Sequence, residues 1–269
     1  MTTPMLMTHA LREAVIAIAR EAAADILAVY QGAFDVEHKD DRSPLTAADL
    51  ASHRRIVAGL QALTPDIPVL SEESKAIDIA QRRTWSRFWL VDPLDGTREF
   101  IKRNGEFTVN IALIEDGVTT FGVIQQPVTG ALWHGTLGEG AFRRDADRDT
   151  DAAIHVRNPA TAPLRIAASR SHRDARTQAL LDALTGSEAV ACGSSLKFCR
   201  IAEGELDMYP RFGPTSEWDT AAGQAILEAA GGAVLDPRGR PFRYNQRETL
   251  LNGDFIAFGD VALRDSLPG

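Results

Sequence analysis

Two series of apolar residues in the first part of the chain recur at helical spacing. The first runs from Leu11 to Tyr30 and predicts an amphipathic helix that ends at Gly32. The second follows a capping-box pattern at residues 46–49 and stops at Pro65, which cannot continue a helix. These spacings predict two helices near the N-terminus, each with one apolar face that needs a partner.

Strand-like patterns follow the second predicted helix. Short apolar runs at residues 69–70 and 88–91 predict two strands, and apolar residues alternate with their neighbours over 107–113. Asp116-Gly117 is a typical hairpin turn, and residues 118–124 form the returning strand. The first part of the chain is therefore predicted to contain an antiparallel sheet.

The second part of the chain alternates between predicted strands and helices. A charged run at residues 143–151, poor in apolar residues, predicts a surface loop between the two parts. Beyond it, strands are predicted at 164–168, 189–191, 206–209 and 233–235, and helices at 174–184, 196–203 and 218–230. This βα alternation indicates a partly parallel sheet. We therefore predict an α/β protein with two subdomains, residues 1–150 and 151–269.

Composition and charge fit a globular protein that does not bind long nucleic acid. Of the 269 residues, 44% are hydrophobic and 25% are charged, which is ordinary for a folded chain. Asp and Glu outnumber Lys and Arg by 37 to 29, and the net charge of −8 argues against a broad surface for phosphate backbones. A local cluster of basic residues could still attract a small polyanion.

The sequence also predicts where the protein resides. It contains no apolar run near the roughly 18 residues of a membrane-spanning helix, and residues 1–10 lack the pattern of a secretory signal. Its two cysteines, Cys192 and Cys199, are too few for a disulfide framework and fit buried free thiols in a reducing compartment. We expect a cytoplasmic protein without an integral membrane segment. Peripheral association with the inner membrane and the choice between monomer and homodimer stay open.

The segment from Trp89 to Thr97 carries the strongest chemical signal. An apolar strand runs there directly into Asp92 and Asp95, which are followed by Gly96 and a threonine. Two carboxylates this close repel each other unless they share a hard cation such as Mg²⁺, which prefers carboxylate oxygens. A helix that begins at this glycine would add free N–H groups able to hold a phosphate. An isolated string of this kind also fits a simple surface turn.

Two further acids occupy comparable positions. Glu72 follows the predicted strand near residue 70, and Asp219 opens a predicted helix. Taken singly, each acid also fits a solvated surface charge or a charge that favours a helix N-terminus. Taken together with Asp92 and Asp95, they fit the acidic cluster of a two-metal phosphatase.

With these acids in place, the sequence resembles the lithium-sensitive, Mg²⁺-dependent phosphatases of the inositol monophosphatase family. Three motifs carry the resemblance and occur in the family's order: Glu72-Glu73-Ser74, residues 92–97 and residues 218–223. The resemblance implies the layered α/β fold of sugar phosphatases, in which an N-terminal antiparallel sheet with helices meets a C-terminal mixed sheet with helices. It places metal binding in residues 1–150, substrate binding in residues 151–269, and the site between them.

Within this family the chain is similar to the bacterial 3′(2′),5′-bisphosphate nucleotidases. The similar stretches are residues 43–49, 92–115, 193–223 and Arg247-Glu248-Thr249, with residues 143–152 left unmatched. Residues 98–101, which follow the central motif, favour this subgroup. The resemblance implies hydrolysis of the 3′-phosphate of adenosine 3′,5′-bisphosphate, a reaction that supports sulfur assimilation.

The resemblance also implies a ligand set for two or three Mg²⁺ ions. One ion would be held by Glu72, Asp92 and the Leu94 carbonyl. A second would be held by Asp92, Asp95 and Asp219, so that Asp92 bridges the two ions. In general, such a pair of ions activates an attacking water and stabilises charge on the leaving oxygen of an in-line displacement.

The family pattern assigns the remaining catalytic roles around this cluster. The Thr97 hydroxyl, hydrogen-bonded to Asp49, would position or deprotonate the attacking water, so the catalytic set is Thr97, Asp49, Glu72 and Asp92. The backbone N–H groups of Gly96 and Thr97 would hold the phosphoryl oxygens. Without the family, Asp49 is simply the acid of a capping box.

Substrate recognition is assigned to basic and hydroxyl side chains in the second part of the chain. The resemblance implies that Ser194, Lys197 and Arg211 bind the nucleotide's other phosphate, although Lys197 and Arg211 also fit solvated surface charges. Ser169 and His172 follow a predicted strand and would line the adenosine pocket. A lone histidine in a loop equally fits a structural or merely exposed role.

Three alternatives remain open at this point. An inositol monophosphatase or a fructose-1,6-bisphosphatase would use the same metal cluster with different pocket residues. A regulatory protein that binds metal or phosphate without catalysis would be expected to lack one of the acids or the Thr97 and Asp49 pair, and this chain has all of them.

Overall fold

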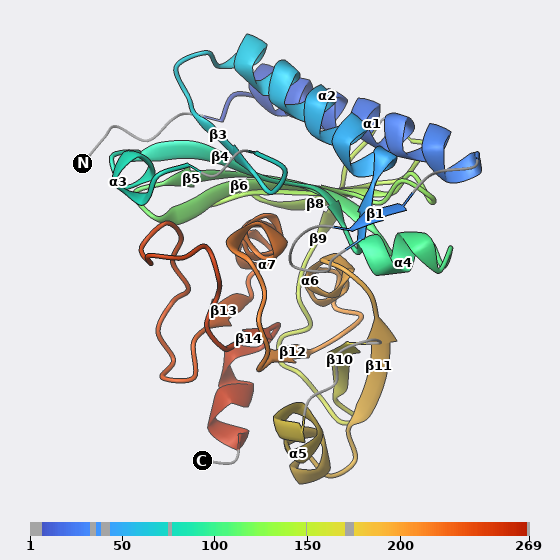
Figure 1. The fold of residues 1–269 in the computed structure, drawn as a ribbon. Helices are drawn as coiled ribbons and strands as arrows, with labels where there is room; N and C mark the ends of the chain where they lie inside the picture. The colour runs from blue at the N-terminus through green and yellow to red at the C-terminus, as the bar shows by residue number, and fades with distance from the viewer. Residues whose placement is uncertain are drawn as a thin grey trace.

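Layers of helices and sheets alternate through the molecule, as Figure 1 shows. The computed structural model describes residues 7–32, 36–38, 44–74, 77–148, 150–169 and 175–267, without the side chains of residues 36–38, 44–46 and 169. Two helices cover the outer face of a large sheet, two shorter helices lie against its inner face, and a smaller sheet follows below them. The predicted layered α/β fold is confirmed.

The large sheet contains seven strands of the described chain in the order β3-β4-β5-β6-β7-β8-β9. The strands are β3 (Val69–Ser71), β4 (Arg87–Asp95), β5 (Thr108–Glu115), β6 (Val118–Gln125), β7 (Leu132–Thr136), β8 (Gly140–Arg144) and β9 (Ala152–Ile154). β3 pairs with β4 in parallel, and every other neighbouring pair is antiparallel. The predicted hairpin joins β5 to β6 through Asp116 and Gly117, both with positive φ as such a turn requires.

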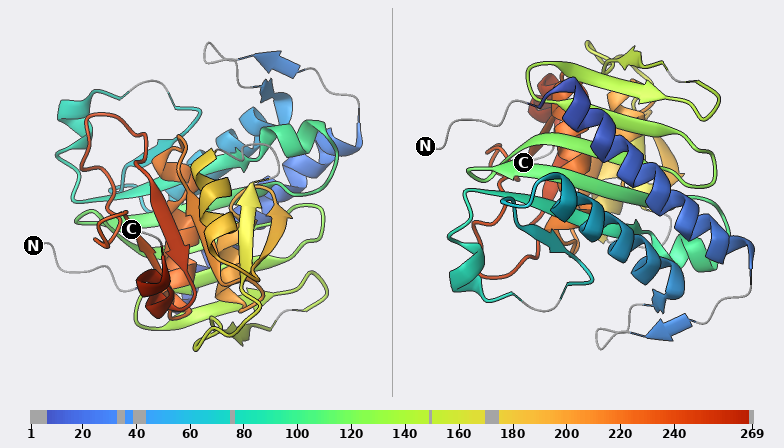
Figure 2. Two further views of the ribbon diagram at one scale, coloured as in Figure 1. Left: turned by 90° about the horizontal axis from the view of Figure 1, so that it is seen from below. Right: turned by 90° about the horizontal axis from the view of Figure 1, so that it is seen from above.

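Helices on both faces explain why the middle of this sheet is buried. Helices α1 (His9–Gln31) and α2 (Ala47–Leu63) lie across its outer face (Figure 2, right). Val109, Ile111 and Leu113 of β5 pack into the core beneath α1 and α2. Ala112 and Ile114 project to the other side, into the core shared with the rest of the chain. Successive side chains of β5 therefore point alternately into two apolar cores, one on each face of the sheet.

The smaller sheet is mixed and has the order β11-β10-β12-β14-β13. Its strands are β10 (Arg165–Ser169), β11 (Glu188–Cys192), β12 (Met208–Arg211), β13 (Ala233–Leu235) and β14 (Phe255–Phe258). β10 is parallel to β11 and β12, while β14 is antiparallel to its two neighbours. The remaining elements are β1 (Val36–His38), β2 (Pro44–Thr46), α3 (Ile79–Arg82), α4 (Thr97–Ile101), α5 (Ala175–Ala183), α6 (Leu196–Ala202), η1 (Glu217–Asp219), α7 (Ala221–Ala229) and η2 (Val261–Ser266).

Helix α7 approaches the large sheet at backbone distance. A Cβ atom added at Gly122 of β6 would lie 2.5 Å from the Ala222 carbonyl oxygen, and one added at Gly135 of β7 would lie 2.8 Å from the Cα atom of Ile226. Only glycine fits at either position. This contact matters for function because α7 begins two residues after Asp219.

The predicted and observed elements differ mainly in extent. The helix predicted at 218–230 is divided into η1 and α7, and β4 continues to Asp95, beyond the predicted end at 91. Helix α4 begins at Thr97, where a helix was predicted after Gly96. Six strands and two short helices had no predicted counterpart: β1, β2, β7, β8, β9, β14, α3 and η2. β9, at residues 152–154, still pairs with the large sheet, so the division into subdomains at residue 150 stays a prediction.

The charged run at 143–151 is only partly the surface loop that was predicted. Arg144 ends β8 and is 6% exposed, because its guanidinium lies between two acids. It donates to Glu13 of α1 at 2.9 Å and to Asp151 at 2.7 Å. The loop prediction was wrong for Arg144, since these ion pairs join the first helix to the far edge of the sheet.

We expect Arg144→Met to destabilise the protein in a pH-dependent way. The hydrogen bond from Arg144 lowers the pKa of Glu13; burial raises the pKa of Asp151, but Arg144 and His134 lower it further than burial raises it. Since both folded-state pKa values lie below the unfolded ones, this contribution is present at neutral pH and is lost as the pH falls below about 4.

Urea unfolding checks this expectation. The variant should be less stable than wild type by about 3 kcal/mol at pH 7, with a smaller difference at low pH. Arg148→Met, an exposed position in the same loop, is the control and should change little. A difference that stays the same from pH 7 to pH 3.5 would contradict the explanation.

Candidate active site

A bulge in β4 brings two carboxylates to one side of the large sheet. Asp92 lies opposite Asn110 on β5, and Asp95 lies opposite Thr108, so three steps along β4 match two along β5. In a regular strand, positions three apart face opposite sides of a sheet. The extra residue of the bulge removes that difference.

Local hydrogen bonds fix the bulge and the turn that follows it. The Asp92 Oδ1 atom accepts from the Leu94 N–H group at 3.1 Å, and the Ser52 hydroxyl of α2 donates to the Pro93 carbonyl at 2.7 Å. Gly96 then has φ of 90°, and a Cβ atom there would lie 3.1 Å from the Glu106 carbonyl oxygen. Glycine is therefore required at the point where β4 gives way to α4.

The third carboxylate comes from the other part of the chain. Asp219 ends η1, where its side chain accepts from the Ser216 N–H group at 2.8 Å in a reciprocal capping box. Carboxylate oxygens of Asp92, Asp95 and Asp219 all lie within 4.8 Å of one another. Residues separated by more than 100 positions thus form one acidic cluster, as the sequence analysis expected.

The electrostatics of the acidic cluster favour a bound cation. Burial raises the pKa of Asp92 well above its usual value, and the charges of Glu72, Asp95 and Asp219 raise it further. Burial also raises the pKa of Asp219 to about 8, with a further contribution from Asp95. The pKa of Asp95 rises to about 6 because burial outweighs the effects of Lys197 and of the Ser195 N–H group. Converging, buried carboxylates that repel one another fit a divalent cation with oxygen ligands.

Glu72 and Asp49 lie at the margin of this cluster. Glu72 follows β3 and donates its N–H group to the Val91 carbonyl at 3.1 Å, and its charge contributes to the raised pKa of Asp92. Asp49, fully buried in α2, contributes in the same way. The three-carboxylate group within 4.8 Å does not include Glu72, so its role as a ligand stays a prediction.

Thr97 is the first residue of α4, directly after the acidic turn, but its hydroxyl has a different hydrogen-bond partner from the one expected. Its hydroxyl donates to the Leu94 carbonyl at 3.4 Å. The expected hydrogen bond to Asp49 is not among the contacts found for Thr97 within the described residues, and the catalytic pairing of Thr97 with Asp49 stays a prediction.

Two of the predicted phosphate-binding residues lie beside the acidic cluster. Lys197 is only 5% exposed, and its ammonium donates to the Ser194 carbonyl at 2.7 Å and to the Cys192 carbonyl at 3.2 Å. Burial overturns the alternative that Lys197 is a solvated surface charge. Arg211 donates to the Pro214 carbonyl at 3.0 Å, and its charge lowers the pKa of Asp219 against the stronger effect of burial.

Ser169 and His172 are the residues predicted to line the adenosine pocket. His172 lies outside the described residues, and Ser169 is described only as the last backbone position of β10. Their roles stay predictions.

Sequence reasoning missed a buried hydroxyl network behind Asp95. The Ser195 N–H group donates to Asp95 Oδ2 at 2.5 Å, while its hydroxyl donates to Asn110 Oδ1 at 2.8 Å and lies 2.8 Å from the Thr108 hydroxyl. The available signal was the pair of polar residues, Thr108 and Asn110, at alternate positions of a strand whose other residues up to Ile114 are apolar. This network ties the loop before α6 to the carboxylate.

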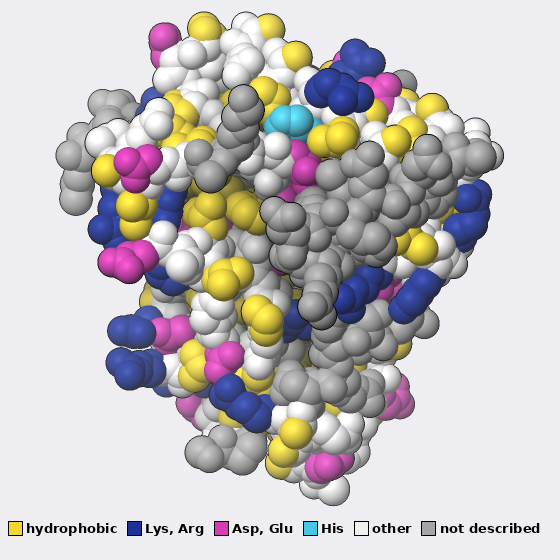
Figure 3. Space-filling model, viewed as in Figure 1, with side chains coloured by type: hydrophobic (Ala, Val, Ile, Leu, Met, Phe, Trp, Pro, Cys, Tyr) yellow, Lys and Arg dark blue, Asp and Glu magenta, His cyan; other side chains and the backbone are white. Residues whose placement is uncertain are grey.

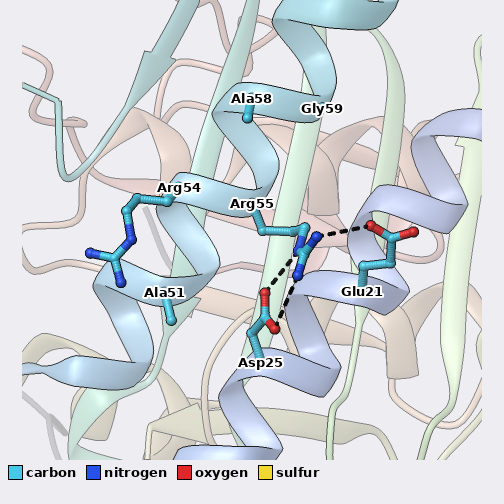
Figure 4. Close-up of a pocket in the computed structure, with 7 residues that line it drawn as sticks. All are labelled: Glu21, Asp25, Ala51, Arg54, Arg55, Ala58 and Gly59. Carbon is cyan, nitrogen blue, oxygen red and sulfur yellow. Dashed lines mark hydrogen bonds and ion pairs between the residues drawn. The ribbon is translucent and has the colours of Figure 1, made fainter.

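A groove elsewhere on the surface contains none of these residues. It measures about 490 Å³ and lies along α1 and α2. Figure 4 shows Arg55 in this groove turned towards Asp25, at 2.9 Å, and Glu21, at 3.7 Å. Of the two arginines that line the groove, Arg55 is thus engaged by acids of the neighbouring helix.

Comparison with known proteins identifies the family. Residues 7–258 match the inositol monophosphatase family. The chain belongs to this family. Among curated members, it is 50% identical over 243 residues to the 3′(2′),5′-bisphosphate nucleotidase CysQ of Escherichia coli O157:H7, covering 90% of this chain and 96% of the relative. It is 37% identical over 256 residues to the Haemophilus influenzae protein of the same name, covering 95% and 94%.

Solved structures of family members share the fold. A crystal structure of CysQ from Bacteroides thetaiotaomicron superposes with a TM-score of 0.82 at 41% identity, covering 94% of this chain and 98% of that one. An inositol monophosphatase from Thermotoga maritima, at 22% identity and a TM-score of 0.79 over 96% and 95% of the two chains, supports the fold alone. The family resemblance inferred from three acidic motifs is therefore confirmed.

Proposed function

We propose that this family member is a Mg²⁺-dependent 3′(2′),5′-bisphosphate nucleotidase that converts adenosine 3′,5′-bisphosphate and water to AMP and phosphate. The convergence of Asp92, Asp95 and Asp219 within 4.8 Å carries the metal-dependent chemistry. The substrate assignment is supported by CysQ relatives that are up to 50% identical over nearly their whole length. Together these observations favour a nucleotide phosphatase over other members of the family.

The acidic cluster would hold two or three Mg²⁺ ions. Asp92, Asp95 and Asp219, whose oxygens converge, would supply the central ligands. Glu72 and the Leu94 carbonyl would complete the set. When bound, Mg²⁺ supplies Lewis-acid stabilisation of the charge that develops on phosphoryl and leaving oxygens. The raised pKa values of the free cluster are consistent with this role, because carboxylates that repel one another gain most from a shared cation.

The chain's own groups orient the substrate and the attacking water. The N–H groups of Gly96 and Thr97, where β4 meets α4, would hold phosphoryl oxygens. Asp49, buried in α2, and the Thr97 hydroxyl would orient the water and take up its proton. Ser194, Lys197 and Arg211 would bind the nucleotide's other phosphate, and Ser169 and His172 would line the adenosine pocket.

Arg211→Ala should weaken substrate binding without removing catalysis. If Arg211 contacts the phosphate that does not react, its loss should raise KM for adenosine 3′,5′-bisphosphate by about 10- to 100-fold with a smaller change in kcat. Steady-state kinetics on the nucleotide and on a substrate with one phosphate measure the effect. The one-phosphate substrate should be nearly insensitive, and an equal loss on both substrates would contradict the assignment.

The position of hydrolysis tests the proposed reaction directly. Phosphorus NMR of the product should show that the 3′-phosphate is released and that the 5′-phosphate remains on AMP. Release of the 5′-phosphate would reverse the assignment of the two phosphate subsites. An inositol monophosphatase or fructose-1,6-bisphosphatase activity would keep the metal cluster but move the recognition residues elsewhere, and a regulatory protein would release no phosphate.

The surface is consistent with a small-molecule substrate. On the face shown in Figure 3, Lys and Arg side chains are dispersed among acidic and apolar ones, which does not favour long nucleic acid. Within the described ranges, no helix is both long enough and apolar enough to cross a membrane. We infer a cytoplasmic enzyme, either monomeric or homodimeric, with peripheral association at the inner membrane left open.

A further inference from the structure

Residues 244–252 link the two parts of the chain that supply the acidic cluster. One side of this 244–252 segment is bound to connections between strands of the large sheet, namely α3 between β3 and β4 and the turn between β5 and β6. The Arg82 guanidinium, at the end of α3, donates to Asn245 Oδ1 at 2.6 Å and to the Arg247 carbonyl at 2.8 Å, and Asn245 Nδ2 donates to the Arg82 carbonyl at 2.7 Å. The Tyr244 N–H group donates to the Gly117 carbonyl at 3.0 Å.

The other side of the segment is bound to the turn that carries Asp219. Glu217 is fully buried, and its two carboxylate oxygens accept from the Asn245 N–H group at 2.8 Å and from Arg247 Nη2 at 2.7 Å. The Glu217 N–H group donates to the Leu250 carbonyl at 2.8 Å. Asn252 completes the contact by donating to the Ser216 carbonyl at 2.7 Å and accepting from Arg247 Nη2 at 2.9 Å.

These contacts bear on the acidic cluster because of where its members originate. Asp92 and Asp95 are on β4 of the large sheet, whereas Asp219 shares the single turn of η1 with Glu217. The 244–252 segment is bound at the same time to Arg82 on the first side and to Glu217 on the second. The hydrogen bonds of Glu217 therefore connect the turn of Asp219, through this segment, to the part of the chain that carries the two β4 acids.

We propose that Glu217 is a positioning residue for Asp219 and that Arg247 and Asn245 hold it in place. The proposal rests on the proposed function in one respect, that Asp219 is a ligand of the catalytic metal. The proposed reaction assigns no role to the Arg247-Glu248-Thr249 motif, and this proposal gives one to Arg247. A carboxylate is required because both of its partners are hydrogen-bond donors, and a carboxamide would turn an N–H group towards one of them.

Removing either member of the pair should weaken metal binding selectively. We expect Glu217→Gln and Arg247→Met to lower Mg²⁺ affinity by about 10- to 100-fold, the usual effect of losing a group that orients a metal ligand. Arg247→Lys keeps the charge but loses the second guanidinium nitrogen: Nη2 donates to both Glu217 and Asn252, while Nη1 donates to the Arg243 carbonyl and fixes the plane of the group. Arg247→Lys should therefore lie between wild type and Arg247→Met. Arg247 is 31% exposed, so its variants should fold even if Glu217→Gln does not.

The matched control is Glu115→Gln, which breaks a comparable ion pair on the large sheet. Glu115 is 7% exposed and accepts from Arg87 Nε at 2.8 Å, at the end of β5 away from the acidic cluster. The control should lose thermal stability as the Glu217 and Arg247 variants do while keeping wild-type Mg²⁺ affinity. A residue with a merely structural role would behave like this control.

Calorimetric titration with Mg²⁺ and the Mg²⁺-dependent rise in Tm are the measurements, and neither depends on turnover. The proposal is supported if the Glu217 and Arg247 variants bind Mg²⁺ more weakly than wild type and if the affinity of Arg247→Lys lies between those of wild type and Arg247→Met. Wild-type Mg²⁺ affinity in Arg247→Met would overturn it. A parallel nucleotide assay separates this result from the proposed function: if wild type binds Mg²⁺ but does not hydrolyse the nucleotide, only the substrate assignment fails.

Discussion

Asp92→Asn is expected to abolish turnover while making the metal-free protein more stable. Asp92 is 1% exposed and lies among the charges of Glu72, Asp95 and Asp219. Burial and repulsion by these charges together make the ionised form of Asp92 costly. Asparagine keeps the shape and an oxygen for the Leu94 N–H group but removes the charge that the cation needs. Loss of about 4 kcal/mol of transition-state stabilisation corresponds to about 10³-fold in kcat.

The stability of the metal-free protein should vary with pH in the corresponding direction. The folded pKa values of about 6 for Asp95 and about 8 for Asp219 lie above the unfolded value near 4. The folded state therefore binds more protons, and stability should fall as the pH rises from about 4 to 8. Asp92→Asn should reduce this slope, and Mg²⁺ should reverse it in wild type only.

Phosphate release and thermal unfolding, each with and without Mg²⁺, measure both effects. Asp66→Asn, an exposed change in the turn after α2, should match wild type in both assays. Retained activity in Asp92→Asn, or a Mg²⁺-induced rise in Tm equal to that of wild type, would contradict the metal assignment.

Gly122→Ala is expected to be the most destabilising single-methyl change in the sheet. The added Cβ atom would lie 2.5 Å from the Ala222 carbonyl oxygen and 2.9 Å from the Ala222 Cα atom, so α7 must move as a unit. Overpacking of this kind costs about 3 kcal/mol. Because α7 starts directly after the turn that holds Asp219, Mg²⁺ affinity should fall as well.

Gly253→Ala is the matched control for the glycine change. A Cβ atom at Gly253 would have no neighbour within 4 Å, and its backbone is outside the positive-φ region. Urea unfolding should show a large loss for Gly122→Ala and almost none for Gly253→Ala. If both variants unfold at the wild-type urea concentration, α7 does not pack against β6 as described.

Local signals in the sequence were enough for the main elements and the acidic cluster. Helical spacing located α1 and α2, because each helix buries one apolar face on a sheet. Alternation and the Asp116-Gly117 turn located the hairpin, whose geometry is set within a few residues. The acids at 92, 95 and 219, which meet in the structure, were found because their family pattern is compact within each motif.

Features that depend on distant partners were not predictable in the same way. Arg144 lies in a charged run of the sequence that predicts a loop, and its burial depends on Glu13, which is 131 positions away. Ser195 meets Asp95 across 100 positions, and Arg82 meets Asn245 across 163. The bulge in β4 is likewise a property of the pairing with β5 and not of β4 alone. These contacts follow from topology, which residue spacing does not encode locally.

Phosphate release in the presence of Mg²⁺ tests the central claim most directly. Adenosine 3′,5′-bisphosphate, inositol 1-phosphate and fructose 1,6-bisphosphate should be compared at equal concentration with the same enzyme preparation. We predict a clear preference for the nucleotide, with AMP as the product and no release once a chelator removes the metal. A preference for inositol or sugar phosphate would contradict the substrate assignment, and release that survives metal removal would contradict the role of the acidic cluster.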